Sequence, residues 1–172
     1  MEGVVHICPA LFLAMCESDE ARALLKPTGG DFTFITSIKG LDAVDGHHPC
    51  KLGQIYWFCN MLLDCQRDDP QKQIVVCAGY NGENVTACAL LLGSFLILCN
   101  GKTASEVSDS FRPISYRFSK YYDTSRHPAA DLSVFECWEA LHAVMMLGWL
   151  DFVESDIDID RCIDMQVSPR RE

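Results

Sequence analysis

The sequence has little positive charge and no long apolar run. It carries 14 Lys and Arg residues against 24 Asp and Glu residues, so its formal net charge is −10 at pH 7. A chain this acidic repels nucleic acids and anionic membrane surfaces, which excludes both as expected partners. Its longest apolar stretch, residues 85–99, contains Thr86 and Ser94 and is shorter than the ~20 residues of a membrane-spanning helix. A basic partner is the natural complement of this charge, although the same charge also serves solubility alone.

Signals for secretion and for metal binding are also missing. The first twenty residues lack a basic flank followed by an apolar stretch, so we expect no signal peptide. The ten cysteines lie mostly in apolar segments and include no C-x-x-C pair, which indicates reduced thiols and a cytoplasmic or nuclear protein. His47, His48 and Cys50 come nearest to a ligand set, but their spacing matches no standard zinc motif. We therefore expect neither a metal nor any other cofactor.

The order of expected elements predicts a single α/β domain. A chain of 172 residues suits one domain, and helical and strand-like patterns alternate along it. This alternation favours a central mixed sheet flanked by helices. Ser18 is expected to cap the first helix, and the spacing of Thr103 and Glu106 predicts a capping box at the start of the helix at residues 103–111. The predicted strands are residues 10–16, 31–38 and 73–79, and the predicted helices are residues 18–25, 51–66, 83–100, 103–111 and 131–148, while residues 112–128 show no period.

The segment "QIVVCAGYNGENVTACALLLG" predicts a buried strand, a glycine-containing loop and an apolar helix. Cys77 ends the strand, Gly79 and Gly82 belong to the loop, and Glu83 begins the helix. Backbone N–H groups at such a helix start bind phosphate well. Cysteine phosphatases use this arrangement, with a thiolate at the start of the loop and an arginine six residues later. Here the sixth residue is Glu83, and Val76 stands where a histidine usually precedes the cysteine.

The carboxylate at position 83 predicts that the loop is disabled. Two unit charges of like sign about 4 Å apart repel by roughly 4 kcal/mol at an effective dielectric constant near 20. A phosphate in this loop would meet a carboxylate where it needs a cation. We therefore interpret Cys77 as a buried strand cysteine and Glu83 as a complement to the helix dipole. The chain itself is expected to be inactive; an enzyme that uses another cysteine is the alternative.

Four segments resemble segments that occur in the same order in a known protein family. They are "ALFLAMC", "HHPCKLGQIYWFCNML", "QIVVCAGYNGENVTACALLLGSFLILCNGKTASEV" and "DLSVFECWEALHAVMMLGWLDF". Together they resemble the amino-terminal domain of the cell-division-cycle-fourteen family of dual-specificity protein phosphatases. The resemblance implies a phosphatase-like domain that lacks a functional loop, packs beside a catalytic domain and helps form the substrate groove. We expect that domain at residues 1–155 and the start of a linker to the catalytic domain at residues 156–172. A free-standing pseudophosphatase that binds a partner protein is the alternative.

Three aspartates in the carboxyl-terminal segment are candidate specificity residues. The resemblance implies an acidic groove that favours phosphoprotein substrates with a basic residue near the phosphorylated site. Asp156, Asp158 and Asp160 alternate with isoleucines, so an extended segment would place the three carboxylates on one face. A plain solvated acidic turn is the other interpretation.

A domain that packs on a partner is expected to expose a contiguous apolar patch. We expect this patch beside the loop Tyr80–Glu83 or around Trp149 and Phe152. The three tryptophans, Trp57, Trp138 and Trp149, are expected in the core, or one of them in an interdomain contact.

Overall fold

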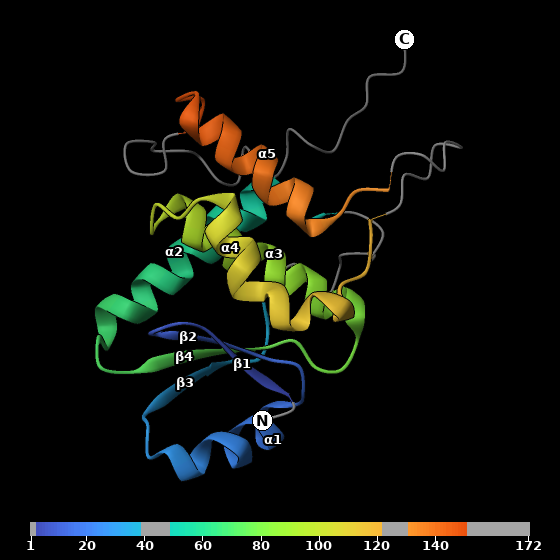
Figure 1. The fold of residues 1–172 in the computed structure, drawn as a ribbon. Helices are drawn as coiled ribbons and strands as arrows, with labels where there is room; N and C mark the ends of the chain where they lie inside the picture. The colour runs from blue at the N-terminus through green and yellow to red at the C-terminus, as the bar shows by residue number, and fades with distance from the viewer. Residues whose placement is uncertain (1–2, 39–48, 122–130, 151–172) are drawn as a thin grey trace.

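The computed structural model describes residues 3–38, 49–121 and 131–150, which build a mixed sheet with helices on both faces (Figure 1). The strands lie in the order β1-β2-β4-β3. β1 runs antiparallel to β2, whereas β4 runs parallel to both β2 and β3. The predicted α/β fold with a central mixed sheet is thus confirmed. The strand bounds are Val4–Cys8 for β1, Leu11–Ala14 for β2, Phe32–Ile35 for β3 and Gln73–Cys77 for β4.

β4 is one of the two inner strands of the sheet, and its middle residues belong to the core. Val76 pairs with Leu13 of β2, and Val75 pairs with Phe34 of β3. Ile74, Val75 and Val76 are all buried. Their continuous apolar run is typical of a parallel strand that is covered on both faces. The sequence predicted this strand and its position correctly.

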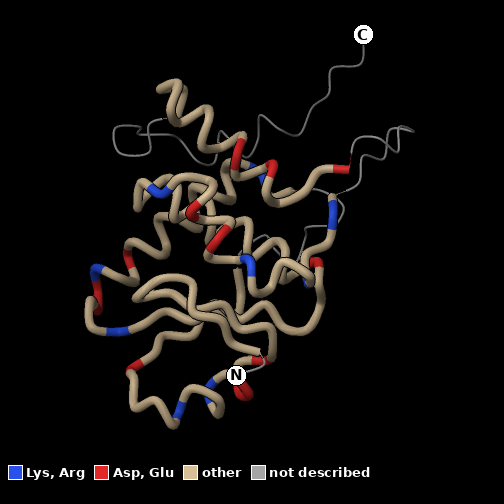
Figure 2. Tube along the Cα trace, in the orientation of Figure 1, with Lys and Arg blue, Asp and Glu red and all other residues tan. Residues whose placement is uncertain are grey.

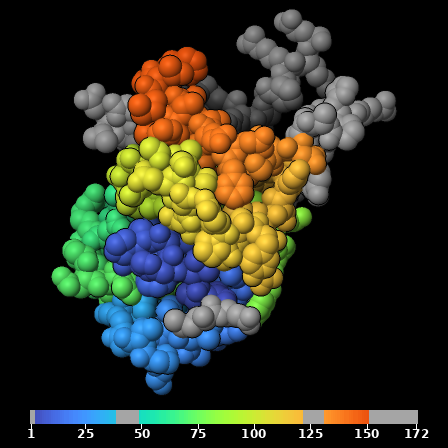
Figure 3. Space-filling view, in the orientation of Figure 1, coloured from blue at the N-terminus to red at the C-terminus, as the bar shows by residue number. Residues whose placement is uncertain are grey.

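Helices cover the two faces of the sheet unequally. α1 (Ser18–Leu25) packs on one face, where Ala21 and Leu25 meet side chains of β1, β2 and β4. The other helices pack on the opposite face, with α3 in the middle, and Figure 3 shows α5 at the end away from the sheet. The remaining bounds are Leu52–Asp68 for α2, Gly82–Leu98 for α3, Ala104–Phe111 for α4 and Val134–Met146 for α5, with 3-10 turns at Lys26–Thr28 and Arg112–Arg117.

Helix starts show where capping was predicted well and where it was not. Thr103 and Glu106 form the predicted reciprocal capping box of α4. The prediction that Ser18 caps α1 is wrong, because Ser18 is already the first helical residue. Glu17 occupies the cap position and its side chain makes no capping hydrogen bond. The predicted bounds of this helix, residues 18–25, agree with α1, so only the identity of the capping residue was wrong.

The sequence patterns did not predict β1 or the two 3-10 turns. β1 is a five-residue edge strand whose pairing with β2 shifts register between His6 and Cys8. An edge strand with an irregularity gives a weak alternation, which explains why the pattern missed it. Residues 112–117 form a 3-10 turn that buries Ile114 against the core. Such short turns have no distinctive hydrophobic period.

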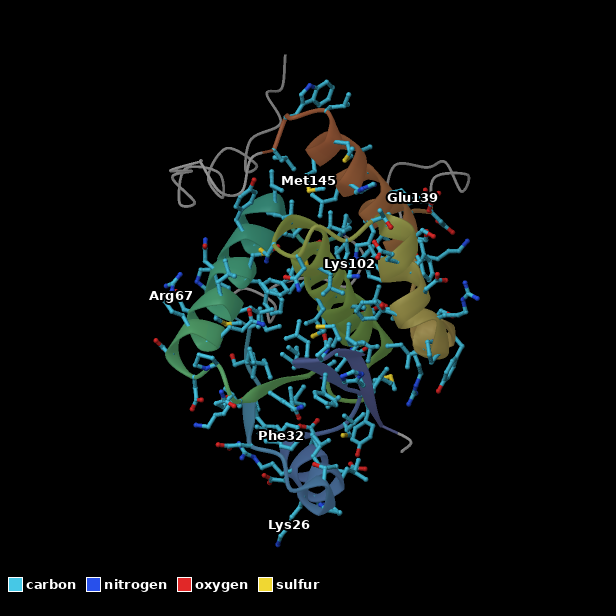
Figure 4. All side chains as sticks on the ribbon, turned by 60° about the vertical axis from the view of Figure 1, so that its left-hand side comes forward. Lys26, Phe32, Arg67, Lys102, Glu139 and Met145 are labelled. Atoms are coloured by element: carbon cyan, nitrogen blue, oxygen red, sulfur yellow. The ribbon has the colours of Figure 1, made fainter. Side chains whose placement is uncertain are left out.

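Charged residues lie mainly on the periphery, and the strands of the sheet are largely free of them (Figure 2). Lys26 and Arg67 both point outward in Figure 4. The ion pair between Arg67 and Asp64, 2.8 Å long and exposed, contributes little to stability. The cysteines within the described ranges are all free thiols. No helix within those ranges is both long enough and apolar enough to cross a membrane.

Candidate functional site

A cavity of about 600 Å³ opens at the carboxyl ends of β2, β3 and β4, beside the start of α3. In open α/β sheets this edge is the usual place for ligand binding. The residues that line the cavity come from the segments that follow the three strands and from α3: Glu17, Ser18, Thr36, Ser37, Ile38, Cys77, Ala78, Gly79, Tyr80, Asn81, Glu83, Asn84 and Cys88.

The loop after β4 is held close to the segment after β2. The N–H of Ala78 donates to the carbonyl of Ala14 at 2.8 Å. Gly79 has a φ of 67°, a left-handed conformation that favours glycine. A Cβ atom at Gly79 would lie 3.2 Å from Oε1 of Glu17. The carboxylate of Glu17 therefore sits directly over the loop backbone.

The start of α3 is capped by the side chain of a loop residue. Asn81 is the N-cap, and its side-chain oxygen accepts the N–H of Glu83 at 2.9 Å. Thr86 donates its hydroxyl to the carbonyl of Gly82 and accepts the N–H of Ser119, both at 2.7 Å. The N–H of Glu83, one of the backbone donors at the helix start that could bind an anion, is therefore already bonded to Asn81.

Gly82 has a packing role and does not line the cavity. A Cβ atom there would lie 3.1 Å from the carbonyl oxygen of Arg117 and 3.3 Å from Oγ of Ser119. Of the four loop residues that the sequence singled out, the structure brings Cys77, Gly79 and Glu83 to the cavity. It places Gly82 against the segment that follows the 3-10 turn at residues 112–117.

Cys77 is a protonated thiol at neutral pH. Its side chain is half-buried at the end of β4. Burial raises its pKa to about 11, with smaller raising effects from Cys16 and Glu17, which outweigh the lowering effect of Arg22. Because the thiolate is the nucleophilic form, a thiol in this environment cannot attack phosphorus effectively at pH 7.

The electrostatics of the cavity oppose an anionic ligand. The lining includes the carboxylates of Glu17 and Glu83 and contains no Lys or Arg among the described residues. At its rim the hydroxyl of Tyr80 donates to the carboxylate of Glu20, and this hydrogen bond raises the pKa of Tyr80 to about 12. Two carboxylates near a bound phosphate would cost roughly 4 kcal/mol each at 4 Å and an effective dielectric constant near 20.

Sequence reasoning missed several residues that line the cavity. Glu17 follows β2, Thr36 and Ser37 follow β3, and Asn84 lies in the first turn of α3. The signal was available in principle, because the carboxyl ends of parallel strands meet at one edge of a sheet. The loop motif drew attention to β4 alone, and Glu17 falls between the predicted strand at residues 10–16 and the predicted helix at residues 18–25, where no pattern marked it.

The other candidate residues lie outside the cavity or outside the described ranges. Asp156, Asp158 and Asp160 are outside the described residues, as are His47 and His48. Cys50 is described and is buried. Within the described ranges, no group of three or more His, Cys, Asp or Glu side chains could hold a metal ion.

Cys77 is expected to react slowly with iodoacetamide at neutral pH. With a pKa of about 11 in place of 9.0, its thiolate fraction at pH 7.5 is about 100-fold below that of an ordinary thiol. The labelling rate, measured by peptide-resolved mass spectrometry, should rise about tenfold per pH unit up to about pH 11. The chain unfolded in urea provides the reference rate. Rapid labelling that is already constant between pH 6 and 8 would contradict this environment.

Comparisons with known proteins show which family and which folds this chain resembles. The family model described as dual specificity protein phosphatase, N-terminal half, matches residues 44–144. No curated protein matches the chain. The crystal structure of PTPMT1 in complex with PI(5)P superposes with a TM-score of 0.53 at 14% identity, over 87% of this chain and 100% of that one. The crystal structure of the Cydia pomonella PTP-2 phosphatase has a TM-score of 0.40 at 14% identity, over 81% of this chain and 90% of that one.

Proposed function

The chain belongs to the family of dual specificity protein phosphatase N-terminal halves, and from that membership we propose that it is a non-catalytic phosphatase-like domain. In this proposal it packs against the catalytic half of the same protein and helps to select phosphoprotein substrates. The ordered resemblance of its segments supports the cell-division-cycle-fourteen branch of the family. The free thiols of the described residues support a reducing compartment, the cytoplasm or the nucleus.

The observation that carries the proposal is the chemistry of the cavity at the end of β4. A phosphatase needs a thiolate and a cation there. This cavity presents the protonated thiol of Cys77 and the carboxylates of Glu17 and Glu83. The chain has a phosphatase-like fold, but its thiol is protonated and a carboxylate stands where the cation is needed, so a supporting role fits the site better than catalysis.

The direct test has a genetic part and a kinetic part. The gene should encode a downstream H-C-x5-R-[ST] motif, and a reading frame that ends at Glu172 would contradict the proposal. The encoded catalytic half should then turn over a phosphoprotein with a higher kcat/KM when the present chain is bound to it. Equal kcat/KM with and without the chain would leave a free-standing interaction module as the better description.

The acidic residues 156–160 carry a separate prediction within this proposal. Changing Asp156 and Asp158 to Asn in the full-length enzyme should raise the KM for substrates with a basic residue after the phosphorylated site. The expected reason is the loss of electrostatic attraction, which also makes the effect weaker at high salt. The KM for p-nitrophenyl phosphate should stay constant. An equal effect on both substrates, or on neither, would show that these residues are ordinary surface charge.

A further inference from the structure

An apolar groove lies further along α3 than the candidate site: Glu83, Asn84 and Cys88 line the site, whereas Leu90 and Ser94 line the groove. We call it the α2–α5 groove: Leu52 and Ile55 of α2 form one wall, Leu141 and Val144 of α5 form the other, and Leu90 of α3 contributes to the floor. Its volume is about 400 Å³, and none of its described lining residues is charged. α3 contacts both α2 and α5. Figure 1 shows α5 at the end of the molecule away from the sheet, and Figure 4 shows Met145 on α5 far from the sheet.

Large apolar side chains are exposed next to this groove, at the end of α5. Met146 is 70% exposed, Leu147 is 62% exposed and Trp149 is 74% exposed, and Trp149 also lines the groove. A contiguous apolar surface of this kind marks an interaction site in a soluble protein. The groove is at the second of the two places where the sequence predicted an apolar patch.

The chemistry of this surface favours a protein helix over a charged ligand. The described acidic residues of α5 are Glu136 and Glu139, and the helix carries no Lys or Arg, so a phosphorylated peptide would be repelled. Two helices that flank a buried third helix leave a groove that a further helix fills by ridges-into-grooves packing. Such a groove binds the apolar face of an amphipathic helix.

The position of Leu150 at the groove supports one source for that helix. The last described residue, Leu150, itself lines the groove, so the segment that follows starts at its wall. The family is described as the N-terminal half of a phosphatase, and a catalytic half joined through this segment would be held near the groove at high effective concentration. Resting on the function proposed above, we propose that the α2–α5 groove receives an apolar helix face of the catalytic half.

The test measures binding of the present chain to the separately expressed catalytic half of the same gene product. Trp149→Ala should raise the Kd at least about 30-fold, since a buried aromatic anchor is a typical hot spot. Leu147→Ala should raise it by a smaller factor. Tyr116→Ala is the matched control, because Tyr116 is a 77% exposed aromatic residue that does not line the groove. That variant should bind within about threefold of the unchanged chain.

Tryptophan fluorescence gives a second readout. Trp149 is the exposed tryptophan, whereas Trp138 is fully buried, so binding should shift the emission of the unchanged chain to the blue and leave that of Trp149→Ala unshifted. If the chain binds but all three variants bind alike, the groove assignment is overturned and the proposed function stands. If the unchanged chain does not bind the catalytic half, both fail. A homodimer that Trp149→Ala dissociates would assign the groove to a second copy and overturn this inference.

Discussion

The purified chain is expected to hydrolyse p-nitrophenyl phosphate no faster than buffer. Two independent defects lead to this result. At pH 7 a thiol with a pKa of about 11 is thiolate in only about one molecule in 10⁴. A cationic arginine at a transferring phosphoryl group is worth about 10³–10⁵ in rate, and this cavity holds Glu83 in its place. Either defect alone would reduce turnover below ordinary detection.

The same reasoning predicts that a single substitution cannot repair the site. Glu83→Arg supplies a cation but leaves Cys77 protonated and Glu17 over the backbone at Gly79. The variant should therefore stay inactive, and so should Cys77→Ser. A dual-specificity phosphatase with an intact loop, assayed in parallel, controls for the substrate and the buffer. Turnover by the unchanged chain that disappears in Cys77→Ser would refute the non-catalytic assignment.

Elements with strong local signals could be predicted from the sequence. α3 was recognised because its residues are apolar all round, and the structure buries residues 85–98 of it. β4 was recognised by its continuous apolar run, and α4 by its capping box. In each case the residues that produce the sequence pattern are the residues that form the helix or strand. The loop that joins β4 to α3 follows from these two elements, so its position could be predicted as well.

Features that depend on tertiary contacts could not be predicted in the same way. The role of Glu17 depends on how close the end of β2 lies to Gly79, which no local pattern encodes. Trp149 was expected in the core or in an interdomain contact; it is not in the core, because α5 ends at the surface. The prediction for Trp138 is confirmed, and that for Trp57 is met in part, since it packs against the core while partly exposed.

Trp138 is expected to make the largest single contribution to stability. It is fully buried between α3 and α5, and its Nε1–H donates to the carbonyl of Leu90 at 3.3 Å. Its ring centroid lies 5.0 Å from that of Phe111 and 5.5 Å from that of Phe135. Trp138→Ala should lower the free energy of unfolding by about 3–5 kcal/mol. Trp149→Ala, at an exposed site, should change it by at most about 0.5 kcal/mol.

Gly93 on α3 leaves the space that the ring of Trp138 occupies, so a substitution at Gly93 tests the packing of that ring. A Cβ atom at Gly93 would lie 2.3 Å from Cε2 and Nε1 of Trp138, so the ring or a helix must move to admit it. Alanine improves helix propensity by about 1 kcal/mol over glycine. Overpacking a core costs about 1–3 kcal/mol, and here the neighbouring group is the rigid, fully buried ring of Trp138. Gly93→Ala should therefore destabilise the protein in urea unfolding measured by circular dichroism.

A double variant of Gly93 and Trp138 distinguishes overpacking from an unrelated effect of Gly93→Ala. Trp138→Phe removes the atoms that the new methyl group would strike, at the cost of a cavity and of the hydrogen bond to Leu90. The double variant should then lose less stability than the sum of the two single variants, because the residues are in contact. Strict additivity would show that α3 and α5 adjust freely. A smaller loss than the sum would show that Gly93 and Trp138 are energetically coupled across the contact between α3 and α5, two of the helices that line the α2–α5 groove.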